Sequence, residues 1–226
     1  MNDETLNDAR IVQGAFIIRK ASITDIDILV SLHLQCFDKK THLIVGLGRS
    51  YIRAMYKWFI ISCETFILVA EHQSYIVGLI AGSDGSYNRP MLRGTILFVV
   101  FGILKHPLLL FNKEFLKRAI KILLGQKIVG EICRNEKGIA YLAFAAIRPS
   151  YRGKGLGDVL YRNAIIECIK RGCKRIRGGV RPKDNPGPTK ILSGYGFTKE
   201  KELETNSTTF WAGEPDIIMS ILGNKK

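Results

Sequence analysis

The sequence predicts an α/β fold, in which short strands and amphipathic helices share one globular unit. Residues 66–70 and 75–81 are apolar, β-branched runs separated by four polar residues, which is typical of an antiparallel hairpin. Residues 25–37 carry apolar side chains at mostly helical spacing. Residues 139–169 read as a strand, a turn and a helix. Strands and helices therefore alternate along the chain, and no repeat or low-complexity segment interrupts them.

Length and composition favour one domain over residues 1–226. The chain has 226 residues, of which 46% are hydrophobic and 24% charged. This length suits a single domain, since domains commonly hold roughly 100 to 200 residues. The hydrophobic share is too high for a disordered chain, and the glycines are too scattered for a fibrous repeat.

The remaining elements follow from short patterns. The β-branched run 16–19 predicts a first strand. The stripe of Tyr51, Ile52, Met55, Tyr56 and Phe59 predicts a second helix, whose aromatic side chains belong either to the core or to the wall of an acceptor pocket. Further along, we expect a strand over 176–180, a short helix over 189–193 and a closing strand over 217–222.

The charge is strongly positive, which favours anionic ligands. Lys and Arg number 34 and Asp and Glu 20, so the formal charge is +14. A basic cluster within residues 170–183 is either a solvated surface or a region that attracts coenzyme phosphates. Nucleic acid is not expected as a partner, because no aromatic residues are interleaved with these charges.

Residues 89–137 form a basic segment with a net charge of +7, half of the total. Its apolar run 96–104 covers about 14 Å as a helix, against about 30 Å for a membrane core, so it is too short to span. Residues 113–124 predict a basic amphipathic helix. That helix either packs on the sheet with a solvated charged face, or contacts anionic lipid or an acidic substrate.

The cysteine pattern and the N-terminus favour the cytoplasm. The five cysteines are odd in number and show no CxxC pair or histidine at zinc-finger spacing, so we expect reduced thiols and no metal site. The first residues are acidic and lack the pattern of a signal peptide.

A glycine-rich turn between the strand at 139–147 and the following helix carries the chemistry. It reads Arg152, Gly153, Lys154, Gly155, Leu156 and Gly157. Glycine permits positive φ and close approach to a ligand, so backbone N–H groups can point at an anion where the helix dipole is positive. The spacing is neither that of a Walker loop nor GxGxxG. A pyrophosphate would suit this geometry.

This turn, followed by Asn185 and by Gly196 and Phe197, resembles the acyl-coenzyme A-binding core of the GNAT family of N-acetyltransferases. The first strand and helix, and the hairpin at 66–81, also look like that family, whereas the segment at about 89–137 counts as an insertion. The resemblance implies a central mixed, mostly antiparallel sheet flanked by helices. It also implies that the fourth and fifth strands splay apart.

The resemblance further implies which residues bind the coenzyme. The amides of Arg152, Gly153, Lys154, Gly155, Leu156 and Gly157 would hold the pyrophosphate, and the strand end at Ala145, Ala146 and Ile147 would hydrogen-bond the pantetheine like an added strand. Asn185 occupies the position of the family's pantetheine-binding side chain, although Asn-Pro is also a turn signal.

Two departures affect the catalytic residues. The family often has Tyr seven residues after that Asn, as a general acid; this chain has Leu192. Tyr195 would substitute if its helix continues through Gly194, and otherwise it packs in the core. A carboxylate early in the fourth strand would fall near Tyr141, which is not acidic. A water chain to Asp84, Glu71 or His72 remains a further candidate for the base.

The expected function is transfer of an acetyl group from acetyl-CoA, without a covalent enzyme intermediate or a metal, to a primary amine. We expect a small-molecule acceptor such as an amino sugar, bound between the first two helices, the insertion and the open end of the sheet. Two alternatives stay open: a non-catalytic coenzyme-binding or membrane-docking module, and a protein or peptide N-acetyltransferase. The protein is expected in the cytoplasm, with peripheral contact to anionic membrane as a further alternative.

Overall fold

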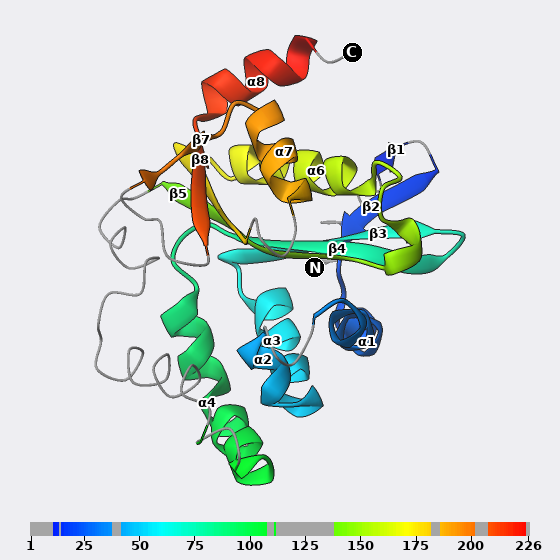
Figure 1. The fold of residues 1–226 in the computed structure, drawn as a ribbon, viewed down its shortest axis with the longest axis vertical. Coiled ribbons are helices and arrows are strands. Elements are labelled where there is room, and N and C mark those ends of the chain that lie inside the picture. Colours follow the sequence, from blue (N-terminus) through cyan, green and yellow to red (C-terminus); the bar gives the residue numbers. More distant parts are fainter. Residues whose placement is uncertain are drawn as a thin grey trace, which may run out of the picture.

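The computed structural model describes residues 11–13, 15–37, 42–107, 111, 138–181, 186–201 and 208–224. Within these ranges the strands form one mixed sheet in the order β1-β2-β3-β4-β5-β6-β8-β7 (Figure 1). The bounds of its strands are β1 Ile11–Gln13, β2 Phe16–Lys20, β3 Thr65–His72, β4 Tyr75–Ser83, β5 Ile139–Ile147, β6 Arg175–Val180, β7 Thr198–Lys199 and β8 Thr209–Gly213. All neighbouring pairs among them are antiparallel except β5 and β6.

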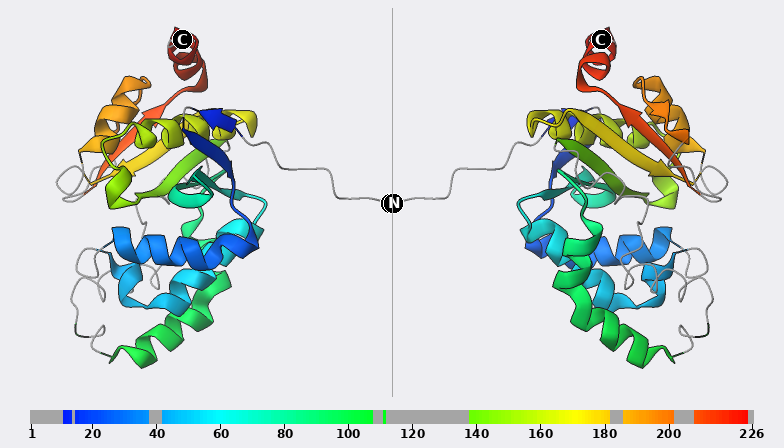
Figure 2. Two further views of the ribbon diagram at one scale, coloured as in Figure 1. Left: turned by 90° about the vertical axis from the view of Figure 1, so that its right-hand side faces the viewer. Right: turned by 90° about the vertical axis from the view of Figure 1, so that its left-hand side faces the viewer.

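Two groups of helices cover the two faces of the sheet (Figures 1 and 2). One face packs against α6 Leu156–Lys170, α7 Gly187–Gly194 and α8 Pro215–Asn224. The other packs against α1 Ile26–Cys36, α3 Arg49–Ile61 and α4 Asn88–Lys105. Shorter elements are α2 Leu43–Gly46 and the 3-10 turns η1 Ile23–Asp25 and η4 Pro149–Tyr151.

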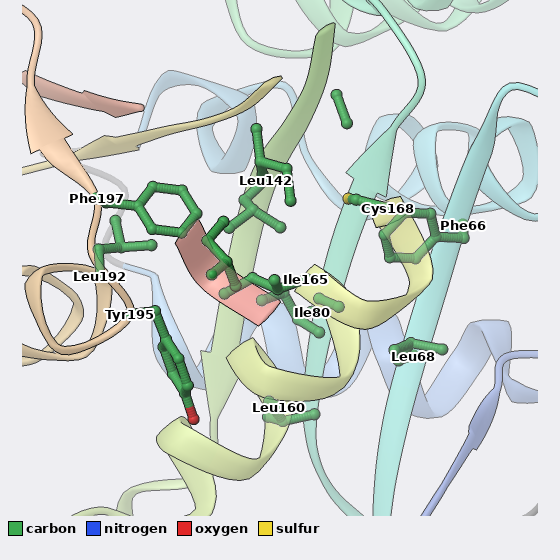
Figure 3. Packing of buried hydrophobic residues seen from close by; sticks show 14 of the residues in the cluster. Phe66, Leu68, Ile80, Leu142, Leu160, Ile165, Cys168, Leu192, Tyr195 and Phe197 are labelled. Carbon is green, nitrogen blue, oxygen red and sulfur yellow. The ribbon is translucent and has the colours of Figure 1, made fainter. Parts of the chain in front are cut away.

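The first group encloses an apolar core. Leu160 and Ile165 of α6 pack against Phe66, Leu68 and Ile80 of the sheet (Figure 3). On the other face, the predicted stripe of α3 is buried: Ile52, Met55, Tyr56 and Phe59 lie in a second core, and Tyr51 packs beside it against Leu47. Their aromatic rings are thus core side chains in this structure. Each face of the sheet therefore buries one helical layer.

The predicted splay is present between β5 and β6. The two strands pair in parallel only from Ile139↔Arg175 to Leu142↔Gly178, although β5 continues to Ile147. A β-bulge at Ala143 starts the half of β5 that does not pair with β6: Leu142 pairs with Gly82 and Phe144 with Ala81, which leaves Ala143 without a partner on β4. A bulge bends a strand and increases its twist, which turns the end of β5 away from β6.

The predicted closing strand at 217–222 is wrong, because these residues lie in α8. Pro215 suits the first turn of a helix, and Asp216 suits its positive end. Ile218 and Leu222, four residues apart, are buried, while Ile217 and Met219 are exposed. This spacing is helical. The last strands of the sheet are instead β7 and β8, which the sequence did not predict.

Candidate functional site

The glycine turn lies between η4 and α6, at the end of β5. Gly153 and Gly155 have φ values of +74° and +78°, a region that side-chain-bearing residues adopt only with strain. Gly155 is the N-cap of α6 and has no side chain to cap the helix. A Cβ atom at either position would meet nothing within 4 Å. The turn therefore presents bare backbone beside open space.

The first turn of α6 directs backbone donors toward that space. The first helical hydrogen bond described here runs from the Val159 N–H to the Gly155 carbonyl, over 3.2 Å. The N–H groups of Leu156, Gly157 and Asp158 precede it, at the positive end of the helix dipole. Arg152 and Lys154 are exposed on the same turn. Donors, dipole and cations together suit a diphosphate group.

Gly157 has a different role, because it is already helical. A Cβ atom there would come within 3.2 Å of Ile191 Cδ1 and 3.6 Å of Ile147 Cδ1. Its missing side chain thus lets α7 and the end of β5 approach the first turn of α6.

The end of β5 offers peptide groups on the side of the splay. The Arg148 N–H donates to the Val77 carbonyl over 2.9 Å, and the register pairs Leu79 with Ala146. In an antiparallel ladder alternate residues bond the same neighbour, so Ala146 also bonds β4 while Ala145 and Ile147 face the other way. Because pairing with β6 ends at Leu142, these two residues face the gap.

Helix α1 ends against this part of β5. The Cys36 thiol donates to the Ile147 carbonyl over 3.2 Å, and Arg152 Nε donates to the same oxygen over 3.1 Å. Burial raises the pKa of the Cys36 thiol, an effect that neighbouring Arg152 partly offsets. Sequence reasoning missed this contact, since 111 positions separate Cys36 from Ile147.

A buried polar pair lies one helical turn before Cys36. His33 Nδ1 and the Tyr56 hydroxyl are 3.0 Å apart. The ring of Phe144, in the half of β5 that does not pair with β6, packs against both of them. Burial, with a smaller contribution from His42, lowers the pKa of His33 to about 3, so the imidazole is neutral at neutral pH. Its Nε2 is buried without a hydrogen-bond partner among the described residues.

Asp84 and Tyr141 lie away from the glycine turn. Asp84 follows β4 and its carboxylate binds Arg171 Nη1 over 2.9 Å, just beyond the C-terminal end of α6. The glycine turn is at the opposite end of this 15-residue helix, about 22 Å away along its axis. Tyr141 pairs with Ser83 and Arg177 in the half of β5 that still bonds β6. The other two candidates for the base also have partners: Glu71 binds Arg19, and His72 Nδ1 lies 3.1 Å from the Tyr151 hydroxyl.

Tyr195 lies beside the glycine turn and just after helix α7, not within it. Helix α7 ends at Gly194 and Tyr195 is its C-cap, 1% exposed. The hydroxyl points toward the start of α6 (Figure 3), where it donates to Asp158 over 3.0 Å. Leu192 is buried in the same core. Asn185 lies outside the described residues, so its predicted coenzyme contact stays a prediction.

Comparisons with known proteins give the family. The family model described as "Acetyltransferase (GNAT) family" matches residues 29–188, which include the glycine turn and the splayed strands. A comparison with curated proteins found no match.

Solved structures share the fold at low sequence identity. An uncharacterized protein from Bacillus halodurans superposes with a TM-score of 0.60 and 10% identity, covering 95% of this chain and 94% of that one. The PaiA N-acetyltransferase from Thermoplasma acidophilum, in complex with coenzyme A, superposes with a TM-score of 0.56 and 13% identity, covering 88% of this chain and 98% of that one. RimL, a ribosomal L7/L12 alpha-N-protein acetyltransferase in complex with coenzyme A, superposes with a TM-score of 0.55 and 14% identity, covering 92% of this chain and 98% of that one. With the family match over most of the chain and the sheet splayed beside a glycine turn, the chain belongs to the GNAT acetyltransferase family and is a GNAT-type acyltransferase.

Proposed function

We propose that this enzyme transfers the acetyl group of acetyl-CoA directly to the primary amine of a small molecule, such as an amino sugar. One observation carries the coenzyme part of the proposal: the bare glycine turn at the start of α6 adjoins the half of β5 that pairs with β4 but not with β6. A diphosphate would meet the backbone N–H groups of the glycine turn, and the amide-bearing chain attached to it would meet the peptide groups of β5.

Each part of the site has a proposed partner in the coenzyme. The pyrophosphate would accept hydrogen bonds from the amides of residues 152–157, with Arg152 and Lys154 adding positive charge. The pantetheine amides would extend the sheet along the peptide group of Ala145 and the N–H of Ile147, whose carbonyl already accepts hydrogen bonds from Cys36 and Arg152. Ala146 would hold that edge in place through its own bonds to β4. Asn185 is proposed to contact the pantetheine as well.

The reaction needs positioning more than a strong acid or base. The amine nitrogen attacks the thioester carbonyl, a C–N bond forms, the C–S bond breaks and the sulfur leaves as a thiolate. The amine must first lose a proton, since its pKa is near 10, whereas a thiol with a pKa near 8.5 leaves readily. Holding the two reactants in line can lower the activation barrier by roughly 7 to 11 kcal/mol.

The acceptor would bind on the α1 and α3 side of β5. On that side of β5, His33 Nε2 is buried without a hydrogen-bond partner among the described residues. The charge of +14 favours an acceptor that carries phosphate. Protein N-terminal acetylation is the second candidate, supported by the fold shared with RimL, a ribosomal L7/L12 alpha-N-protein acetyltransferase.

We also propose a cytoplasmic location for the enzyme. The four cysteines that the structure describes, Cys36, Cys63, Cys168 and Cys173, are free thiols, which supports a reducing compartment.

Calorimetric titration with coenzyme A tests the binding site. Gly155→Ala should weaken binding about tenfold or more, because the turn must shift to relieve a positive φ. Gly172→Ala is the matched control: Gly172 has the same φ of +78° and the same open space, but lies past the other end of α6. Gly172→Ala should lower the free energy of unfolding about as much as Gly155→Ala, and it should leave the affinity for coenzyme A unchanged. Equal affinity of both variants and the wild type would refute the site.

A thiol-release assay with acetyl-CoA over a panel of amines tests the reaction. Turnover of amino sugars above that of peptides supports the proposal, and the reverse order supports the protein acetyltransferase. Coenzyme binding without acetylation of any amine, including those of a lysate, would instead identify a binding module.

A further inference from the structure

Helix α4 is fixed to the molecule along one narrow stripe. Met91, Thr95 and Gly102 are buried against α3 and the end of α2. Two glycines permit the close approach: a Cβ atom at Gly94 would come within 2.7 Å of Trp58 Cδ1, and one at Gly102 within 2.7 Å of the Leu47 carbonyl oxygen. The position of the helix is therefore set by backbone contacts that leave its other side free.

That other side is apolar and exposed. A helix on the surface of a soluble protein normally turns charged and polar residues to water. Here the exposed fraction of Leu97 is 79% and that of Leu104 is 74%. The remaining members of this surface, which we term the α4 apolar face, are Ile96, Phe98, Val100 and Phe101. Exposed apolar patches that are contiguous over several turns mark contact surfaces.

Positive charge lies at both ends of this face. Arg93 precedes it and Lys105 follows it, and both are exposed. Lys105 Nζ lies 4.6 Å above the ring of Phe101, so its stem runs along the apolar face with the charge at the edge. The sequence contains no Asp or Glu between Asp84 and Glu114. This charge pattern is complementary to an anionic surface.

The geometry suits a helix that lies on a membrane. None of the helices in the described part is long and apolar enough to cross a bilayer. As an 18-residue helix, α4 would lie about 27 Å along the surface. It lies at one end of the molecule, on the face of the sheet opposite α6 (Figures 1 and 2), so this contact leaves the glycine turn at the start of α6 open.

We propose that the α4 apolar face docks on an anionic lipid surface, with its apolar side chains in the acyl boundary and Arg93 and Lys105 against lipid phosphates. This proposal does not rest on the proposed acetyl transfer. It would bring the enzyme to acceptors held at a membrane.

Vesicle flotation of the full chain tests the proposal. At low salt the protein should float with vesicles of phosphatidylcholine and phosphatidylglycerol, and more weakly with phosphatidylcholine alone. The double variant Leu97→Gln/Leu104→Gln should lower the partition about tenfold or more. Tyr75→Gln, which removes an exposed aromatic residue of β4 at a distance from α4, is the matched control and should bind like the wild type.

Circular dichroism and the heat of coenzyme A binding show that each variant is folded, because these leucines support neither the core nor the glycine turn. Absence of flotation of the wild type with anionic vesicles would overturn the proposal. So would a dimer in solution that Leu97→Gln/Leu104→Gln converts to a monomer, since a second copy would then cover the face. Loss of coenzyme binding alone would bear on the proposed function and not on this surface.

Discussion

The Tyr195 hydroxyl donates a hydrogen bond to the Asp158 carboxylate over 3.0 Å, and this contact joins the end of α7 to the first turn of α6. Burial and the Asp158 carboxylate both raise the pKa of Tyr195 above its ordinary value. The phenol thus keeps its proton at neutral pH and donates it in a hydrogen bond to Asp158, beside the glycine turn. This arrangement favours the packing role for Tyr195 over the role of general acid.

We therefore predict that Tyr195→Phe lowers the free energy of unfolding by about 1 kcal/mol, the usual contribution of one hydrogen bond. The kcat for acetyl transfer should stay within about threefold of the wild type, because the reacting groups lose no proton donor. Chemical unfolding and steady-state kinetics measure the two effects. A fall in kcat of about a hundredfold, with the alkaline limb of the pH profile lost, would instead identify Tyr195 as the acid.

A second prediction concerns Arg177, which is 5% exposed inside the sheet. Its guanidinium binds both carboxylate oxygens of Glu200, at 2.8 and 3.0 Å. Glu200→Gln should lower the free energy of unfolding by about 3 kcal/mol, since it removes the negative charge that accepts these two hydrogen bonds from the buried guanidinium. Asp27→Asn removes the partner of Arg53 in an exposed ion pair and should cost less than about 1 kcal/mol. Equal losses in urea unfolding would contradict this account.

The ion pair of Arg177 and Glu200 also shows what the sequence alone cannot predict. The basic cluster in residues 170–183 contains no acid of its own, so the sequence predicts either a solvated surface or a region that attracts coenzyme phosphates. The structure brings acids from elsewhere: Glu200 to Arg175 and Arg177, and Asp84 to Arg171. Pairing across 23 and 87 positions leaves no periodic signal in the chain.

Local patterns were predicted well, because local physics determines them. The hairpin, α3, β5 and α6 follow from apolar spacing, and the glycine turn from the need for positive φ at Gly153 and Gly155. The run at 217–222 failed because six mostly apolar residues fit a strand or a buried helix equally well. The bulge at Ala143 depends on the register against β4, which no single segment encodes.

The register yields a third prediction, on Ala145 and Ala146. Proline at position 145 removes an N–H that faces the gap, so the ladder with β4 should survive and the protein should fold. Its affinity for coenzyme A should fall about tenfold, the loss of one hydrogen bond to the pantetheine. Ala146→Pro removes an N–H that bonds β4 and should unfold the protein or strongly lower its stability.

Calorimetry and thermal unfolding compare the two variants. If Ala145→Pro folds and binds coenzyme A like the wild type, the free edge of β5 does not hold the pantetheine. If Ala146→Pro proves the more stable variant, the alternation inferred from the Arg148 N–H and the Val77 carbonyl is wrong.

The final prediction concerns pH and His33, 2% exposed between Tyr56, Phe37 and Phe144. Its pKa is about 3 in the folded protein, against 6.5 for a free imidazole. The unfolded chain therefore binds one more proton than the folded protein between these values. Stability should be complete above pH 6.5 and fall by up to about 1.4 kcal/mol per unit as the pH drops below it.

The upper part of this range, from pH 6.5 to about 5.5, isolates the imidazole from the described carboxylates with lowered pKa, Asp25 and Glu167, because their ordinary values of 3.8 and 4.5 leave them ionised there in both the folded and the unfolded chain. His33→Gln should flatten the slope in urea unfolding. Tyr56→Phe should lower stability but keep the slope, since the imidazole remains buried. A wild-type protein whose stability is constant across this window would show that His33 reaches solvent and carries its proton in the folded state.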